Sequence, residues 1–171
     1  MTVETEFLSF SADKLAQLLN RIDTCVQKLT GEQVWAKNSA KQNSVGNLLL
    51  HLNGNVRQWI MHAIAGQPNL RDRDAEFSAH DGPRAPELLA RLQATVEEAI
   101  AVLHALPSER LLERVHVQGY DRTVLAAIYH VVEHFAGHTF QIIYATKLLT
   151  GEDLGFYAHL SGASGLKDPL P

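Results

Sequence analysis

Apolar residues recur at steps of three and four along four long stretches of the chain. This spacing predicts amphipathic helices, each with one stripe to bury. The expected helices cover residues 4–29, 44–65, 86–106 and 123–149. The residues expected to end them are Gly31, Gly66, Pro107 and Gly151. Four such stripes are buried most simply against one another, so we expect an all-α fold, an up-down four-helix bundle.

The connections between these helices differ in length and composition. Residues 32–43 read as a polar connection with Trp35 as its one apolar anchor. Residues 69–86 form a long polar connection with two prolines, and connections of that length are often functional or mobile. We expect a helical turn over 108–114 and a short extended or hairpin-like piece over 115–121. The tail, 152–171, is rich in glycine, serine and proline and is expected to be irregular, and residues 1–171 are expected to form a single domain.

Composition excludes several classes of protein. A net charge of −4 over 171 residues does not suit a nucleic-acid binder, which normally carries a basic face. Cys25 is the one cysteine, so it can form no intrachain disulfide and no cysteine-rich zinc or iron–sulfur site, and we expect it to pack in the core. No apolar run is long enough for a membrane span, and the acidic N-terminus lacks the order of a signal peptide, so we expect a cytoplasmic protein.

The nine histidines are the chain's main candidates for chemistry. His134 and His138 are four residues apart on one predicted helix, so their rings can converge on one ion. His130 lies one turn earlier on the same row, and spacing alone permits the pair 130/134 as well as 134/138. Either pair needs a third ligand from another part of the chain.

His51 offers that ligand from the second predicted helix. It lies within an apolar run, where an imidazole without a partner would be costly to bury. Metal ligation would satisfy it, and helical bundles often build metal sites from inward side chains on facing helices. The alternative is that these histidines are core residues that hydrogen-bond to each other. A zinc protease is excluded as a class, because Glu133 precedes His134 and points away from the site.

Together these segments resemble the DinB-like superfamily, also called the YfiT-like metal-dependent hydrolases. The resemblance extends from the first helix to about Leu149, and its members are four-helix bundles. It implies one histidine ligand from the second helix and a His-x-x-x-His pair from the last, which here are His51 and His134/His138. The family pair is commonly followed by a glutamine, and Gln141 matches it, which favours 134/138 over 130/134.

Two further stretches are similar to one bacterial branch of the superfamily whose function is unassigned. They are residues 47–55 and 71–77. The arginine-glycine that commonly follows the second histidine is replaced by Thr139-Phe140. Relatives in the superfamily include metal-dependent transferases and isomerases that use low-molecular-weight thiols.

The resemblance implies a metal-dependent enzyme that activates such a thiol, or water, at a three-histidine site. Zinc or nickel is the expected ion, with iron or manganese as alternatives. The expected partner is a small-molecule substrate, and a homodimer is compatible with the sequence. The alternative from a different class is a non-catalytic metal-binding or interaction protein, whose site would be structural or sensory.

Other polar residues are weaker candidates. Asn55, Gln141 and His130 are candidates for groups that orient a ligand or bound water, with an ordinary helix-seam role as the alternative. The run 71–74 (Arg-Asp-Arg-Asp) is expected to be a solvated, self-paired loop, or alternatively to recognise a charged substrate. The remaining histidines are expected at the surface or in loops, and they are His62, His80, His104, His116 and His159.

Overall fold

The structure, a computed structural model, describes residues 2–39 and 41–160. Its helices are α1 (Val3–Val26), α2 (Gly31–Trp35), α3 (Val45–Val56), α4 (Arg73–Ser78), α5 (Ala85–Ala105) and α6 (Val124–Thr150). A π-helical segment (Arg57–His62) continues α3, and short 3₁₀ turns cover Ser108–Leu112 and Ala158–Leu160. Two antiparallel strands, β1 (Arg114–Val117) and β2 (Tyr120–Thr123), form a hairpin before α6. The protein is therefore mostly helical.

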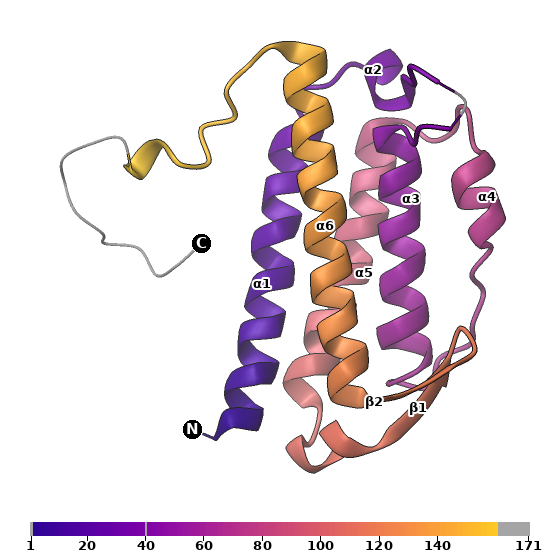
Figure 1. The fold of residues 1–171 in the computed structure, drawn as a ribbon, viewed down its shortest axis with the longest axis vertical. Coiled ribbons are helices and arrows are strands. Elements are labelled where there is room, and N and C mark those ends of the chain that lie inside the picture. Colours follow the sequence, from indigo (N-terminus) through magenta and orange to yellow (C-terminus); the bar gives the residue numbers. More distant parts are fainter. Residues whose placement is uncertain (1, 40, 161–171) are drawn as a thin grey trace.

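Four long helices, α1, α3, α5 and α6, lie side by side and enclose the core (Figure 1). Their buried stripes are the apolar positions that the sequence pattern picked out. The largest fully buried side chains include Phe135, Leu15, Ile22, Leu52 and Leu92. Side-chain caps begin three of these helices, since the hydroxyl groups of Thr2, Ser44 and Thr123 each accept a backbone N–H from the first turn. The positions of the long helices were thus predictable from the sequence.

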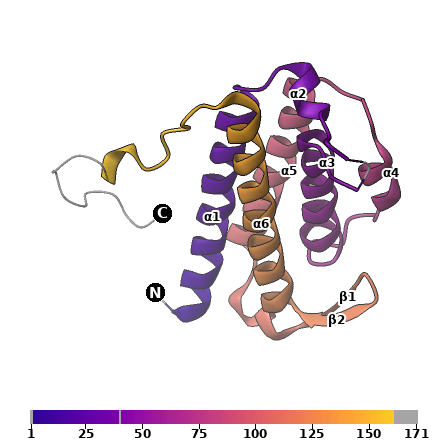
Figure 2. The same cartoon turned by 45° about the horizontal axis from the view of Figure 1, so that its top comes forward.

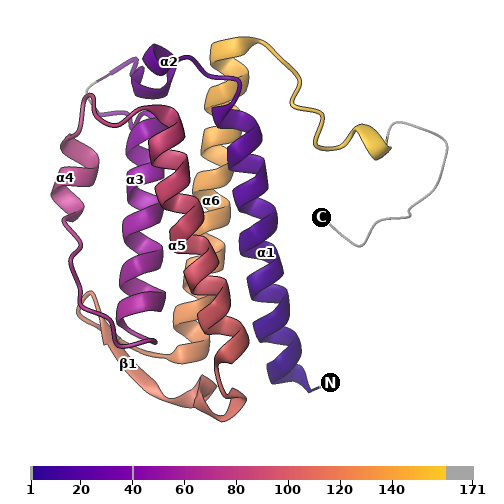
Figure 3. The same cartoon turned by 180° about the vertical axis from the view of Figure 1, so that it is seen from behind.

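The order of directions differs from the simple up-down alternation that we expected. Lys37 Nζ, before α3, donates to Ala79 O, before α5, at 3.4 Å. At the other end, Arg110 after α5 donates to Ile64 O after α3, also at 3.4 Å. The helices α3 and α5 therefore run in the same direction, as Figure 3 also shows. The reason is the connection 66–84, which is long enough to return along the whole bundle before α5 begins.

That connection is more ordered than expected, because it contains α4 and is fastened along α3. The amide nitrogen of Asn47 donates to the backbone oxygens of Glu76 and Ala79, at 2.8 and 2.9 Å. Asp72 caps α4 by accepting the Ala75 N–H at 3.0 Å. Asn47 is fully buried, so these bonds hold the connection against the bundle away from water.

The hairpin and the connection that contains Trp35 agree with the sequence analysis, whereas the end of α1 does not. The hairpin expected near 115–121 is present and projects at the end of the bundle where α3 finishes (Figure 2). Trp35 anchors its connection, as expected, with its ring against Gly46. Gly31 does not stop α1 as a left-handed residue, because α1 already ends at Val26 and Thr30 caps the separate helix α2.

The tail is irregular from Gly151 to Tyr157 and ends, within the described residues, in the turn Ala158–Leu160. It stays near α1 through Arg21, whose guanidinium lies over the rings of Phe156 and Tyr157. The rest of the predicted irregular tail, 161–171, lies outside the described residues. Within the described part of the chain, no helix has the length and apolar character needed to cross a bilayer.

Candidate metal centre

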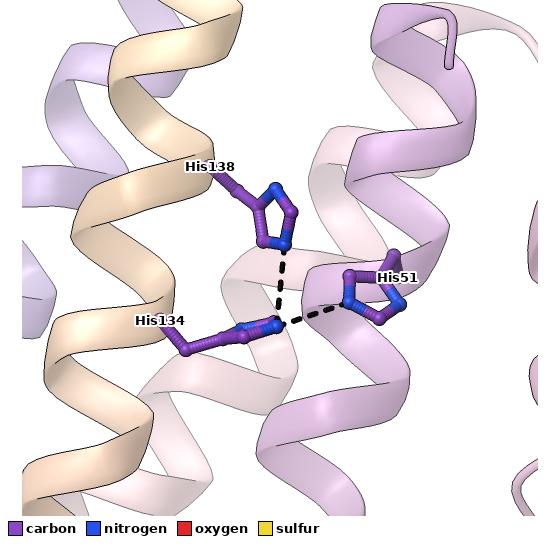
Figure 4. A group of neighbouring side chains, drawn as sticks. All are labelled: His51, His134 and His138. Carbon is purple, nitrogen blue, oxygen red and sulfur yellow. Dashed lines mark hydrogen bonds between the residues drawn. The ribbon is translucent and has the colours of Figure 1, made fainter. Parts of the chain in front are cut away.

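Three histidine rings from two helices meet beside the core (Figure 4). His51 comes from α3 and is buried, and His134 and His138 come from successive turns of α6 and are half-buried. His134 Nε2 lies 3.1 Å from His51 Nε2 and 3.2 Å from His138 Nε2. In the described residues this is the one group of three or more histidine, cysteine or carboxylate side chains close enough to hold an ion.

Hydrogen bonds on the far side of two rings fix where their lone pairs point. His51 Nδ1 lies 2.9 Å from Glu76 Oε2, which can only accept, and 3.1 Å from a terminal nitrogen of Arg71, which can only donate. That arginine nitrogen donates at a shorter distance, 2.8 Å, to Glu76 Oε2 itself, so we assign the proton to His51 Nδ1. His138 Nδ1 in the same way donates to Gln141 Oε1 at 2.8 Å. In the neutral form of each of these two rings the lone pair is therefore on Nε2, the nitrogen that faces His134.

Hydrogen bonding alone does not satisfy this arrangement. A neutral His134 ring has at most one proton on Nε2, so it can donate to His51 or to His138 but not to both. A cation at the meeting point would accept all the lone pairs. Three nitrogens held tetrahedrally at about 2.0–2.1 Å from zinc lie about 3.3 Å apart, close to the two separations seen here. The donor set therefore fits a divalent metal ion.

Burial favours the neutral form of the two α6 rings, His134 and His138, which is the form that metal ligation requires. It lowers the pKa of His134 to about 3, with the neighbouring His138 and His51 rings adding to the effect. Burial also lowers the pKa of His138, partly offset by its hydrogen bond to Gln141. Protons therefore do not compete with a cation for His134 and His138 near neutral pH.

Glu76 is a site residue that the sequence analysis missed. Its carboxylate is buried on α4 and joins His51 to Arg71, which donates from Nε to Oε1 at 2.7 Å and from a terminal nitrogen to Oε2 at 2.8 Å. Burial alone would raise the pKa of Glu76, but the hydrogen bonds from Arg71 and His51 outweigh it and hold the pKa below its usual value. Glu76 is thus an ionised carboxylate that orients His51, the arrangement commonly found behind metal-binding histidines.

Arg71 corrects the expectation of a solvated, self-paired run at 71–74. Its side chain is only 3% exposed and pairs with Glu76 instead of with its neighbours in the run. It also donates to Gln58 Oε1 at 3.0 Å, which ties the connection to the π-helical end of α3. Arg73 does lie at the surface, over the ring of Phe77. Arg71 is therefore occupied within the protein, and Arg73 is the arginine of the run that stays exposed.

Gly54 makes room for this ion pair. A Cβ atom at this position of α3 would overlap Glu76 Oε1 and would lie 2.9 Å from its Cδ and 3.0 Å from Arg71 Nε. Phe77, the residue after Glu76 on α4, also contacts His51, and the centroids of the two rings are 4.6 Å apart. The histidine is therefore in contact with both an aromatic ring and a buried carboxylate of α4.

The three weaker candidates occupy different positions. Gln141 accepts from His138, as described above. The ring of His130 is 5.4 Å from that of His134 and 4.2 Å from that of Trp59, and it is not part of the ligand group. Asn55 is buried one turn after His51, and its side chain makes no hydrogen bond to the described residues.

The other candidates agree with the sequence analysis, except that His62 lies on the π-helical segment and is not in a loop or fully exposed. Cys25 is buried among apolar side chains, and burial raises the pKa of its thiol, so it packs as expected and is no nucleophile. Of the remaining histidines, His62 is partly buried and bonded to Gln67 O. The exposed ones are His80, His104, His116 and His159.

Comparison with known proteins identifies a family and a fold. Among solved structures, a conserved protein from Enterococcus faecalis has a TM-score of 0.71 at 16% identity, over 89% of this chain and 99% of that one. The DinB-like protein YjoA from Bacillus subtilis has a TM-score of 0.66 at 16% identity, over 86% of this chain and 96% of that one. No curated protein matches the sequence. The model of one family, described as a protein of unknown function (DUF1572), matches residues 2–163. The chain therefore belongs to the DUF1572 family and shares its fold with a DinB-like protein, in agreement with the resemblance seen in the sequence.

Proposed function

We propose that this protein is a metal-dependent enzyme whose divalent ion, zinc or nickel, is held by His51, His134 and His138. One observation carries the proposal: the lone pairs of two oriented rings converge on a third ring, and the described residues supply no fourth side chain to close the group. Structural zinc sites are closed by four protein ligands, whereas catalytic sites keep one position for water or substrate. The three-ligand set favours the catalytic class.

The chain's own residues would do the following. The three neutral imidazoles would hold the ion and leave its charge uncompensated, since no carboxylate is among the ligands. Glu76 would keep the Nδ1 proton of His51 in place, and Gln141 would do the same for His138. When bound, the ion would supply Lewis acidity, which lowers the pKa of a thiol or water and makes it a nucleophile. A low-molecular-weight thiol is our proposed substrate or cosubstrate, in a transferase or hydrolase type of reaction.

Metal analysis tests the ligand set first. Protein purified without a histidine tag should contain about one zinc or nickel ion per chain. His138→Ala should lose it, whereas His104→Ala, at an exposed position near the end of α5, should keep it. A full equivalent of metal in His138→Ala would refute the assignment.

Turnover tests the reaction class separately. The metal-loaded protein is incubated with glutathione, bacillithiol or mycothiol and an electrophile, and conjugate formation is followed by mass spectrometry. We expect conjugation that stops after chelation and returns with added metal. A metal-binding protein with no metal-dependent turnover of any thiol, and no hydrolysis, would instead support the non-catalytic alternative of a structural or sensory site.

A further inference from the structure

A pocket lies on a different face of α3 from the one that carries His51. Its volume is about 440 Å³, and it is bounded by α3, the segment 68–72, α4 and α5, which come together on the side shown in Figure 3. Arg71 and Glu76 line it, so their ion pair forms the wall between this pocket and the histidine site. The volume is in the range typical of small-molecule sites.

The charge of the lining is positive although the protein is acidic. Arg57 and Arg91 face the pocket from α3's π-helical end and from α5. Arg91 makes no ion pair or hydrogen bond within residues 2–39 and 41–160, although its charge acts on the exposed carboxylate of Glu87 one turn earlier. Arg57 makes only long contacts, a hydrogen bond to Thr95 Oγ1 at 3.4 Å and an ion pair with Glu98 at 3.7 Å, in which both side chains are about half exposed. The Arg71 charge is balanced by Glu76. With Asp72 counted, the lining carries one net positive charge, in a chain whose net charge is −4.

The neutral polar groups of the lining also present donors. Asn53 Oδ1 accepts from the buried hydroxyl of Thr95 at 2.7 Å, so the amide oxygen is occupied and its NH₂ group has no partner in the described structure. Asn69 is in the same situation: its Oδ1 accepts the Arg71 backbone N–H at 3.3 Å, and its NH₂ group has no partner in the described structure. Two guanidinium groups and two amide NH₂ groups therefore surround one space. Oxyanions match such a set, because carboxylate and phosphate oxygens only accept hydrogen bonds.

Apolar groups complete the pocket. Leu50, Leu70 and Ala75 line it. Leu70 belongs to the segment 68–72, and its side chain is 89% exposed. A leucine this exposed beside a basic pocket would be covered by the hydrocarbon part of a ligand. We propose that this pocket binds a small organic anion, whose carboxylate or phosphate group lies between Arg57 and Arg91. The proposal does not depend on the metal site.

Titration with two anions tests the proposal on the intact protein. Inorganic phosphate and glutarate are titrated separately at constant ionic strength, and binding is followed by calorimetry and by amide chemical shifts in ¹H–¹⁵N spectra. We expect saturable binding of at least one of them, with shifts at Asn53 and Asn69. The two titrations distinguish a phosphate site from a carboxylate site.

Matched variants locate the binding. Arg57→Gln and Arg91→Gln should each weaken it about tenfold or more, because a hydrogen bond to a charged group is lost. Arg84→Gln, which removes an exposed arginine outside the pocket, should leave it unchanged, and so should His138→Ala. Both arginines of the pocket are at the surface, so the variants are expected to fold, which circular dichroism checks. Absence of saturable binding, or equal affinity in Arg57→Gln, Arg91→Gln and the parent, would overturn the proposal.

Discussion

Gly54→Ala is the substitution for which the structure makes the least intuitive prediction. An alanine inside a helix is normally more stable than a glycine by about 0.5–1 kcal/mol. At position 54 the added Cβ would occupy the space of the Glu76 carboxylate. That carboxylate cannot simply swing away, because it is buried and bonded to both Arg71 and His51.

The magnitude follows from the two opposing contributions. Disrupting a buried ion pair costs about 3–5 kcal/mol, since a charge is left without its partner. After the helical gain is subtracted, we expect Gly54→Ala to lower the free energy of unfolding by about 2–4 kcal/mol. Metal affinity should fall as well, because His51 loses the group that orients it.

Urea unfolding of the metal-free protein is the assay, with Gly137→Ala as the matched control. Gly137 is also within a long helix, α6, but a Cβ there would meet nothing within 4 Å. The control should therefore gain about 0.5–1 kcal/mol. If Gly54→Ala were as stable as the parent, Glu76 would be free to move, and its role in fixing His51 would have to be abandoned.

Three further predictions concern the same site. Glu76→Gln should weaken metal binding about ten- to a hundredfold in a chelator competition, because the carboxylate that holds the His51 proton is lost, and unchanged affinity would contradict that role. His130→Ala should keep one metal ion per chain by elemental analysis, whereas His134→Ala should lose it; the reverse result would mean that the pair 130/134 is the ligand pair after all. Metal-free protein should become less stable in urea as the pH falls from about 6.5 towards about 3, because unfolded His134 takes up a proton that the folded ring, with its pKa of about 3, does not. His134→Gln should show a shallower fall over that interval, and an identical pH profile would argue against a depressed pKa.

The long helices and the meeting of the three histidines could be anticipated because both follow from periodicity. A stripe at three- and four-residue steps fixes the buried face of a helix, and His134 and His138 share a face by the same geometry. His51 could be assigned to the interior because of the leucines around it. The ring-to-ring distances, and the hydrogen bonds that select each tautomer, needed the structure.

Glu76 and Arg71 could not be found in this way, because the connection that carries them has no periodicity to interpret. The contacts of Glu76 with His51 and Arg71 span 25 and 5 residues, and the first depends on how the connection lies along α3. The direction of α5 depends on the same feature. One local signal was present: Gly54 lies inside a predicted helix, where glycine is unfavourable and usually has a packing reason.

The separation of the three histidines along the chain has a consequence for biosynthesis if they bind the proposed ion. His51 and His134 are 83 positions apart, and α6 leaves the ribosome after α1, α3 and α5. A nascent or truncated chain that lacks α6 has only one of the three imidazoles and cannot retain the ion tightly. The chain would therefore bind its metal ion only after α6 has been synthesised, and truncated chains without α6 would be metal-free.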